Sequence, residues 1–258
     1  MILDRHVPFS TVFNFRDLGG YPGAAGRVVR TGVLYRADGL FRLAESDLER
    51  FHALGLRTVL DLRRADELAA DGRIAESLDL DYVNIDFNRA PWPPADLDPD
   101  EMPRYYADRY AEMVDDGLRH DNPVGQALRM FVERERMPMV FHCAAGKDRT
   151  GVLAALVLSL VGVDDDTIAA DYALSAEGER RYYEWVRGGA APRTNSASTE
   201  GAVGVATDAP WVLNPCPADA MLMFLGELRE RHGSVEDYAA KAGFGAADVT
   251  ELRRHLLS

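Results

Sequence analysis

A ten-residue segment between two apolar runs constrains the fold of this chain more than any other feature. Residues 142–151 read HCAAGKDRTG. The preceding residues 139–141 are apolar and suit a short buried strand, and residues 152–158 form an apolar run that is typical of a buried helix. The sequence therefore predicts a strand, a loop and a helix in this order.

The loop has the composition of an anion-binding nest. The first N–H groups of the following helix have no partner inside the helix, and the helix dipole adds about half a positive charge at the same end. The small residues at positions 144–146 let the backbone curl so that successive N–H groups point inward. The residues expected to bind a phosphate are Ala144, Ala145, Gly146, Lys147, Asp148 and Arg149.

Cys143 and Arg149 are the candidates for chemistry in this loop. A thiol at a helix N-terminus and near a guanidinium is expected to have a pKa below its ordinary value of about 8.5, so that it is a nucleophilic thiolate. The planar fork of Arg149 matches two equatorial oxygens of a phosphoryl group. His142 is expected to orient the loop from behind. Thr150 has two candidate roles, donation of its hydroxyl to the sulfur and capping of the helix.

The pattern Cys-x5-Arg-Thr behind a histidine resembles the signature of the cysteine-dependent protein tyrosine phosphatase superfamily. A second segment, NFRDLGG at residues 14–20, narrows the resemblance to the bacterial and fungal branch that includes the secreted mycobacterial phosphatase B. The resemblance extends over nearly the whole chain. It includes YRAD at 35–38, TVLDLR at 58–63 and HGSVEDY at 232–238.

This resemblance implies a fold and an activity. The expected fold is α/β, with a central, mostly parallel sheet flanked by helices and a helical C-terminal part, in a single phosphatase domain over residues 1–258. The implied activity is hydrolysis of phosphomonoesters through a phosphocysteine intermediate, without a cofactor. Arg16 and Asp17 are expected to be architectural residues beside the loop. In the family a helical lid occupies the region of residues 187–208, but here Gly, Ala, Ser and Thr dominate, so we expect a flexible or lid-like segment.

Hydrophobic periodicity and capping residues predict the remaining elements. Residues 87–103 contain five prolines and several acids, so they are expected to form a loop. The predicted strands are 57–62 and 82–85, and the predicted helices are 44–54, 104–114, 123–135, 164–174, 218–231 and 247–257.

The general acid for the leaving group stays open among three carboxyls. Asp148 lies in the loop, Asp86 ends a predicted strand, and Asp96 lies in the proline-rich stretch. In the mycobacterial relative the acid follows this strand by a few residues, and the corresponding positions here hold Asn88 or Arg89. We favour Asp148, which needs no loop closure, over Asp86 and then Asp96.

Composition excludes several other classes of protein. The net charge of −13 argues against nucleic acid or an anionic membrane surface as a general partner. No apolar run is long enough for a signal or a bilayer span, so a cytoplasmic location is expected, with export by another route left open.

Only two cysteines occur, so no disulfide framework is expected, and whether Cys216 resolves an oxidised Cys143 stays open. No cluster at ligand spacing suggests a metal. The cations expected to attract an anionic substrate are Arg16, Arg63, Arg64, Lys147 and Arg149.

Several alternatives remain beside phosphotyrosine hydrolysis. Lys147 next to Arg149 suits a substrate with more than one phosphate, so a phosphoinositide is the second candidate after a phosphorylated protein, although Asp148 offsets part of this charge. A phosphate-binding module without turnover is a third. A rhodanese-type sulfurtransferase lacks the GKDRTG continuation, and a buried structural cysteine does not account for the strand before it and the helix after it. The oligomeric state stays open.

Overall fold

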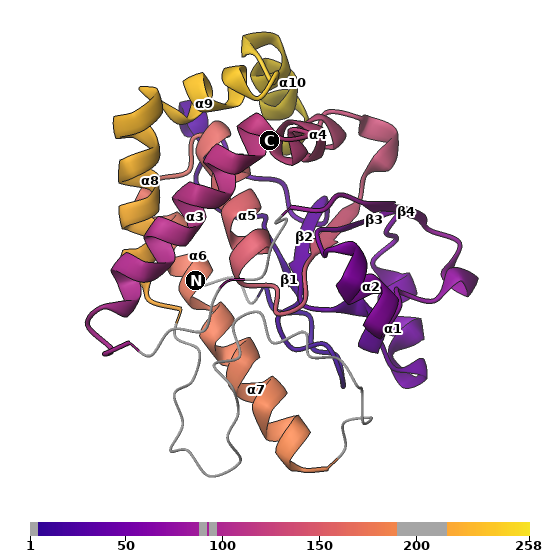
Figure 1. Cartoon of the computed structure of the whole chain (residues 1–258). Coiled ribbons are helices and arrows are strands. Elements are labelled where there is room, and N and C mark those ends of the chain that lie inside the picture. The colour runs from indigo at the N-terminus through magenta and orange to yellow at the C-terminus, as the bar shows by residue number, and fades with distance from the viewer. Residues whose placement is uncertain (1–4, 88–91, 93–96, 190–215) are drawn as a thin grey trace.

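The computed structural model describes residues 5–87, 92, 97–189 and 216–258, and within this part the chain forms a five-stranded sheet (Figure 1). The strand order is β1-β2-β5-β3-β4. The pairs β2–β5, β5–β3 and β3–β4 are parallel, and β1 is antiparallel to β2. The prediction of a mostly parallel sheet is therefore confirmed. The strands are β1 (Arg16–Asp17), β2 (Leu34–Ala37), β3 (Thr58–Asp61), β4 (Asp81–Asn84) and β5 (Met139–His142).

Helices cover both faces of this sheet. Figure 1 shows α3, α5 and α8 gathered on one side and α1 and α2 on the other. The described helices are α1 (Leu48–Ala53), α2 (Ala65–Asp71), α3 (Met102–Arg119), α4 (Pro123–Met130), α5 (Asp148–Leu160), α6 (Asp165–Ala173), α7 (Ser175–Arg187), α8 (Ala218–His232), α9 (Val235–Lys241) and α10 (Ala246–Leu256).

Strand β5 lies in the middle of the sheet, and all four of its residues are buried. Successive side chains of a strand point to opposite faces. Met139 and Phe141 accordingly pack into the core that contains α3, α5 and α8, whereas Val140 packs into a second core with Phe15 and Phe51. Burial on both faces explains why this strand reads as a continuous apolar run in the sequence.

Most predicted elements are confirmed, with shifted ends. The strands expected at 57–62 and 82–85 are β3 and β4, and the capping residue Asp164 accepts a hydrogen bond from the Thr167 N–H at 2.9 Å. The helix predicted over 123–135 is wrong beyond Met130, where α4 ends and a 3-10 turn follows at residues 134–136. After Met130 the N–H groups of residues 131–133 bond to the carbonyls three residues back instead of four, so the α-helix tightens and ends.

Two helices in the second half of the chain were not predicted. Helix α7 is strongly polar and has Gly178 in its second turn, and α9 is only seven residues long. Residues 187–189 end α7, and the rest of the expected lid-like segment lies outside the described residues. Across the described ranges, no helix combines the length and the apolar character needed to cross a membrane.

Candidate active site

Cys143 directly follows β5, at the carboxyl edge of the parallel strands, and is 1% exposed. Helix α5 begins five residues later, at Asp148. The predicted order of strand, loop and helix is therefore present. In open parallel sheets ligands bind at this edge, so the sulfur lies where a ligand site is expected.

Donors from outside the loop hold three successive loop carbonyls. In a trans peptide the N–H of the next residue points opposite to the carbonyl, so the N–H groups of residues 145–147 point away from these donors. This is the polarity that an anion-binding nest requires. The contacts are Gly39 N–H to Ala144 O at 2.9 Å, Asn14 Nδ2 to Ala145 O at 3.2 Å and to Gly146 O at 3.1 Å, and Arg36 Nη2 to Gly146 O at 2.8 Å.

Gly146 is the one loop residue that must be glycine. Its φ is +69°, in the left-handed region, and a Cβ at this position would lie 2.4 Å from the carbonyl oxygen of Ala37. The loop therefore packs directly against the backbone at the end of β2. Any larger side chain here would move the loop carbonyls and the N–H groups behind them.

The Arg149 guanidinium is paired in bidentate fashion with Glu67. Its Nη1 lies 2.5 Å from Glu67 Oε2 and its Nη2 lies 2.9 Å from Oε1, and both residues are buried. Burial raises the pKa of Glu67, but the hydrogen bonds and charge of Arg149 outweigh it, so the net pKa lies below its ordinary 4.5. The carboxylate is thus an ionised partner that fixes the plane of the guanidinium.

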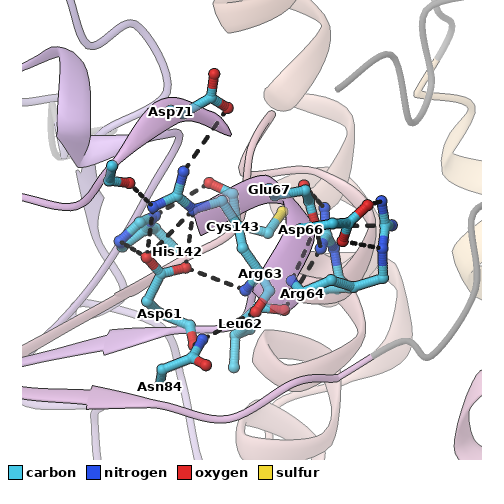
Figure 2. Close-up of polar contacts among 12 residues, drawn as sticks. Asp61, Leu62, Arg63, Arg64, Asp66, Glu67, Asp71, Asn84, His142 and Cys143 are labelled. Atoms are coloured by element: carbon cyan, nitrogen blue, oxygen red, sulfur yellow. Dashed lines mark hydrogen bonds and ion pairs between the residues drawn. The ribbon is translucent and has the colours of Figure 1, made fainter. Parts of the chain in front are cut away.

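Glu67 was missed by the sequence reasoning. It lies in the first turn of α2, where its Oε2 also accepts the Arg64 N–H at 2.9 Å. Figure 2 shows Glu67 with its contact to Arg64, on the segment that leaves the end of β3. The only sequence signal was an acid three residues after a helix start, which predicts a capping role but no long-range partner.

His142 and the acid–base pair beneath it support the start of the loop (Figure 2). The His142 Nδ1–H donates to the Cys143 carbonyl at 3.0 Å, and Nε2 lies 3.5 Å from Asp61 Oδ2. Burial lowers the pKa of His142. Burial raises the pKa of Asp61, but His142 and the Arg63 guanidinium at 2.7 Å lower it to about 2. Arg63 is therefore fully buried in an ion pair with Asp61. The sequence had suggested instead that Arg63 attracts an anionic substrate.

Lys147 and Asp148 lie side by side at the end of the loop. Lys147 is buried with its Nζ 3.6 Å from Asp148 Oδ1 and 4.0 Å from the centroid of the Tyr106 ring. Burial lowers the pKa of Lys147, and the charge of Asp148 raises it, with a net pKa well above 10.5. The Tyr110 hydroxyl donates to Asp148 Oδ1 at 2.6 Å and is itself 2.6 Å from the Tyr172 hydroxyl.

Buried charge pairs tie the N-terminal motif and β2 to Asp171 in α6. Arg16 Nε contacts Asp171 at 3.0 Å, and Arg36 Nη1 contacts the same carboxylate at 2.7 Å. Asp17 accepts the N–H groups of Gly19 and Gly32. Arg16 and Asp17 thus have partners other than the loop anion, the placement expected of architectural residues.

The other candidates are dispersed. Thr150 is buried at the start of α5, and within the described part of the chain its Oγ1 has no hydrogen-bond partner. Asp86 is exposed after β4, two strands away from β5, and Asp96 lies outside the described residues. Cys216 is buried, and burial raises the pKa of its thiol to about 12. Among the residues described, no three or more His, Cys, Asp or Glu side chains gather in a way that could hold a metal ion.

Comparison with known proteins identifies the family. The model of the tyrosine phosphatase family matches residues 7–258, which is nearly the whole chain. The chain belongs to the tyrosine phosphatase family. The loop from Cys143 to Arg149 lies inside the matched region of this phosphatase, as does the N-terminal segment that anchors it.

Two bacterial relatives are similar over most of their length. This phosphatase is 33% identical to a Cupriavidus necator protein named among the tyrosine-protein phosphatases, over 98% of this chain and 89% of that one. It is 26% identical to the triple specificity protein phosphatase PtpB of Mycobacterium tuberculosis, over 95% of this chain and 96% of the relative. Among solved structures, the catalytic core of Siw14 matches 72% of this chain and 98% of that chain, at 13% identity and a TM-score of 0.41.

Proposed function

We propose that this tyrosine phosphatase hydrolyses phosphate monoesters, with phosphotyrosine as the preferred substrate, through a phosphocysteine at Cys143. The observation that supports the proposal most is that one loop contains both a candidate nucleophile and a candidate oxygen-binding arginine. A buried cysteine begins a loop whose carbonyls are tied outward, and an arginine held in plane by Glu67 ends it. A phosphate bound in this loop would meet the sulfur, the N–H groups and the guanidinium together.

In the first step the Cys143 thiolate attacks phosphorus and the bond from phosphorus to the leaving oxygen breaks. The inward N–H groups of the loop and the Arg149 fork stabilise the charge on the equatorial oxygens. Asp148, protonated for this step, gives its proton to the leaving oxygen. The resulting products are an alcohol or phenol and a phosphocysteine.

In the second step water attacks the phosphocysteine and the sulfur departs as a thiolate. Asp148, now a carboxylate, accepts the proton of the attacking water, and inorganic phosphate is released. Thr150 Oγ1, buried without a hydrogen-bond partner in the described part of the chain, can donate to the departing sulfur. This role satisfies an otherwise unpaired buried hydroxyl.

One contact and the order of the strands support Asp148 over Asp86 as the acid. Asp148 belongs to the loop and is oriented by the Tyr110 hydroxyl at 2.6 Å. Asp86 follows β4, and two strand spacings of nearly 5 Å each separate that strand from β5. An acid must lie within hydrogen-bond reach of the leaving oxygen, directly or through one water. Asp86 and Asp96 remain the alternatives to be tested beside it.

We expect Asp148→Asn to slow poor leaving groups more than good ones. An acid matters in proportion to the basicity of the oxygen that leaves, so turnover of phosphotyrosine should fall by roughly a hundredfold and that of an activated aryl phosphate by much less. The basic limb of the pH profile of kcat/KM should also disappear. Steady-state kinetics on both classes of substrate measure these effects.

Asp86→Asn and Asp96→Asn are the matched comparisons, with vanadate inhibition as the check that the loop is intact. If Asp148→Asn slows both substrate classes equally and weakens vanadate binding, Asp148 holds the loop and is not the acid. A leaving-group-dependent loss in Asp86→Asn alone would transfer the acid role to the end of β4.

Turnover itself separates the proposed enzyme from a binding module. Vanadate-sensitive release of p-nitrophenol from p-nitrophenyl phosphate, unaffected by a chelator, supports the phosphatase. Tight binding of a phosphotyrosyl peptide without turnover would support the module and overturn the proposal.

A phosphoinositide is the second candidate substrate. Lys147 adds a cation next to Arg149, and the mycobacterial relative is named for triple specificity. Lys147 is fully buried against Tyr106, however, and Asp148 lies 3.6 Å from it, which favours a single phosphate close to the loop. Faster phosphate release from a phosphoinositide panel than from phosphotyrosyl peptides would reverse this order.

A further inference from the structure

Helix α7 presses one face against the structure that holds the phosphate loop. Ser175, at its first turn, is buried with its Oγ 3.3 Å from Arg16 Nη2. Gly178 packs so closely on Asn14 that a Cβ would lie 2.8 Å from the Asn14 Cβ, and Asn14 is the residue that binds two loop carbonyls. Residues four apart lie on the same face of a helix. Glu179 therefore shares the face of Ser175 and points toward the loop.

Glu179 is a buried carboxyl that the proposed mechanism does not use. It is 6% exposed and lies on the buried face of α7 with Ser175 and Gly178. Burial raises the pKa of Glu179 to about 7, an effect that Lys147 opposes and Asp148 reinforces. The charged and titratable groups that face it are Lys147 and Asp148 from the loop, Asp38 and Arg42 from the segment after β2, Tyr183 from α7 and Cys216 from the start of α8.

We propose, on the basis of the phosphatase function proposed above, that Glu179 is a positioning residue that sets the charge beside the phosphate loop. Its uncharged carboxyl admits a doubly charged phosphate next to Lys147, and its carboxylate repels that anion. A single negative charge even about 10 Å from a dianion is sufficient to change the affinity for that anion by tenfold or more at an effective dielectric constant of about 20. The residue thereby couples anion affinity to proton binding on α7.

The test measures anion binding in a protein whose nucleophile does not titrate. Sulfate is the probe, because it stays a dianion across the neutral range and its affinity reports the protein groups alone. In Cys143→Ser protein, calorimetry should show sulfate binding about tenfold weaker at about pH 8 than at about pH 6. In the double variant with Glu179→Gln, most of this difference should vanish, because the amide carries no charge at either pH.

The matched control is Glu184→Gln on the exposed side of the same helix, where the carboxylate pairs with Arg180. This control should keep the full pH dependence. An equal pH dependence with and without Glu179→Gln would overturn the proposal for Glu179 and leave the phosphatase function untouched. A failure of sulfate to bind at either pH, to the parent protein and to Cys143→Ser protein alike, would instead overturn the anion-binding loop, and with it both proposals.

The proposal can also be tested with Glu179 unchanged, in case the Glu179→Gln variant does not fold. Coupling between two binding events is reciprocal, so sulfate must raise the affinity of Glu179 for its proton. Calorimetry of Cys143→Ser protein near pH 7, in buffers of different ionisation enthalpy, should show net proton uptake on sulfate binding. The absence of proton uptake would also overturn the proposal.

Ionisation of Glu179 should also make the stability of the folded protein depend on pH. The pKa of Glu179 in the folded chain, about 7, lies above its ordinary 4.5, so ionisation of this group costs stability as the pH rises through this interval, and the full cost remains above it. Glu179→Gln should therefore melt several degrees above the parent protein at about pH 8 and close to it at about pH 4. A parent protein that melts as high as the variant at both pH values would show that Glu179 carries no buried charge.

Discussion

Cys143→Ser protein is expected to lose turnover by roughly a thousandfold or more and to keep its affinity for anions. A serine hydroxyl stays protonated where a thiol becomes a thiolate, so the nucleophile is lost. The loop carbonyls are held by Asn14, Arg36 and Gly39, and none of these contacts uses the sulfur. The nest should therefore survive the substitution. Turnover of p-nitrophenyl phosphate and calorimetric binding of sulfate measure the two properties separately.

The other cysteine provides the matched control for this substitution. Cys216 is also buried, but it lies two residues before α8 and outside the loop. Cys216→Ser should retain most of its turnover. Substantial activity in Cys143→Ser protein would mean that the nucleophile has been wrongly assigned. Loss of both turnover and sulfate binding would mean that the sulfur is needed to shape the loop.

The part of the site that is local in sequence could be predicted. An apolar strand, small residues at 144–146 and an apolar helix are close neighbours along the chain, and their physical consequences act over a few residues. The requirement for glycine at position 146 could be predicted only in part. A tight loop was readable from the sequence, but the contact with the Ala37 carbonyl that excludes a Cβ was not.

The partners that hold the site are distant in sequence and left no local signal. Glu67 lies 82 residues from Arg149, and Asp171 lies 135 residues from Arg36. Buried charges require opposite charges nearby. Partners for these arginines were therefore expected, but the sequence did not show which acids they are. The same limit left the general acid open, because the choice depends on distances between separate strands and the loop.

Helix α7 was missed because charged and polar residues dominate its sequence. Its exposed side carries Glu177, Arg180 and Glu184, which form ion pairs at spacings of three and four residues. Such pairs stabilise a helix by only a few tenths of a kcal/mol each. The buried face is polar too, since it carries Ser175 and Glu179 toward the loop. The more polar and less polar side chains of α7 are still segregated on opposite faces, but few of them are strongly apolar, so the helix was not recognised.

A second large effect is expected from Arg149→Lys, which should lower kcat/KM by roughly a thousandfold. Lysine keeps the charge but lacks the planar fork that matches two equatorial oxygens. It also cannot pair in bidentate fashion with Glu67, whose two oxygens lie 2.5 Å and 2.9 Å from the guanidinium nitrogens. The loss should appear mainly in kcat, because the transition state gains more from the fork than the ground state does.

Glu67→Gln tests whether this carboxylate acts through Arg149. The amide keeps the shape of the side chain but offers only one acceptor oxygen, so the guanidinium loses its fixed plane, and turnover should fall by roughly tenfold to a hundredfold. Asp66→Asn is the control on the same helix, since Asp66 is exposed and pairs with Arg64. In a double-mutant cycle, Glu67→Gln should have little further effect once Arg149 is lysine, because a positioning residue has nothing left to position. An equal loss from Glu67→Gln in both backgrounds would assign Glu67 to the stability of α2, and the plane of Arg149 would then have to be set by another contact, such as the one with the Leu62 carbonyl at 3.5 Å.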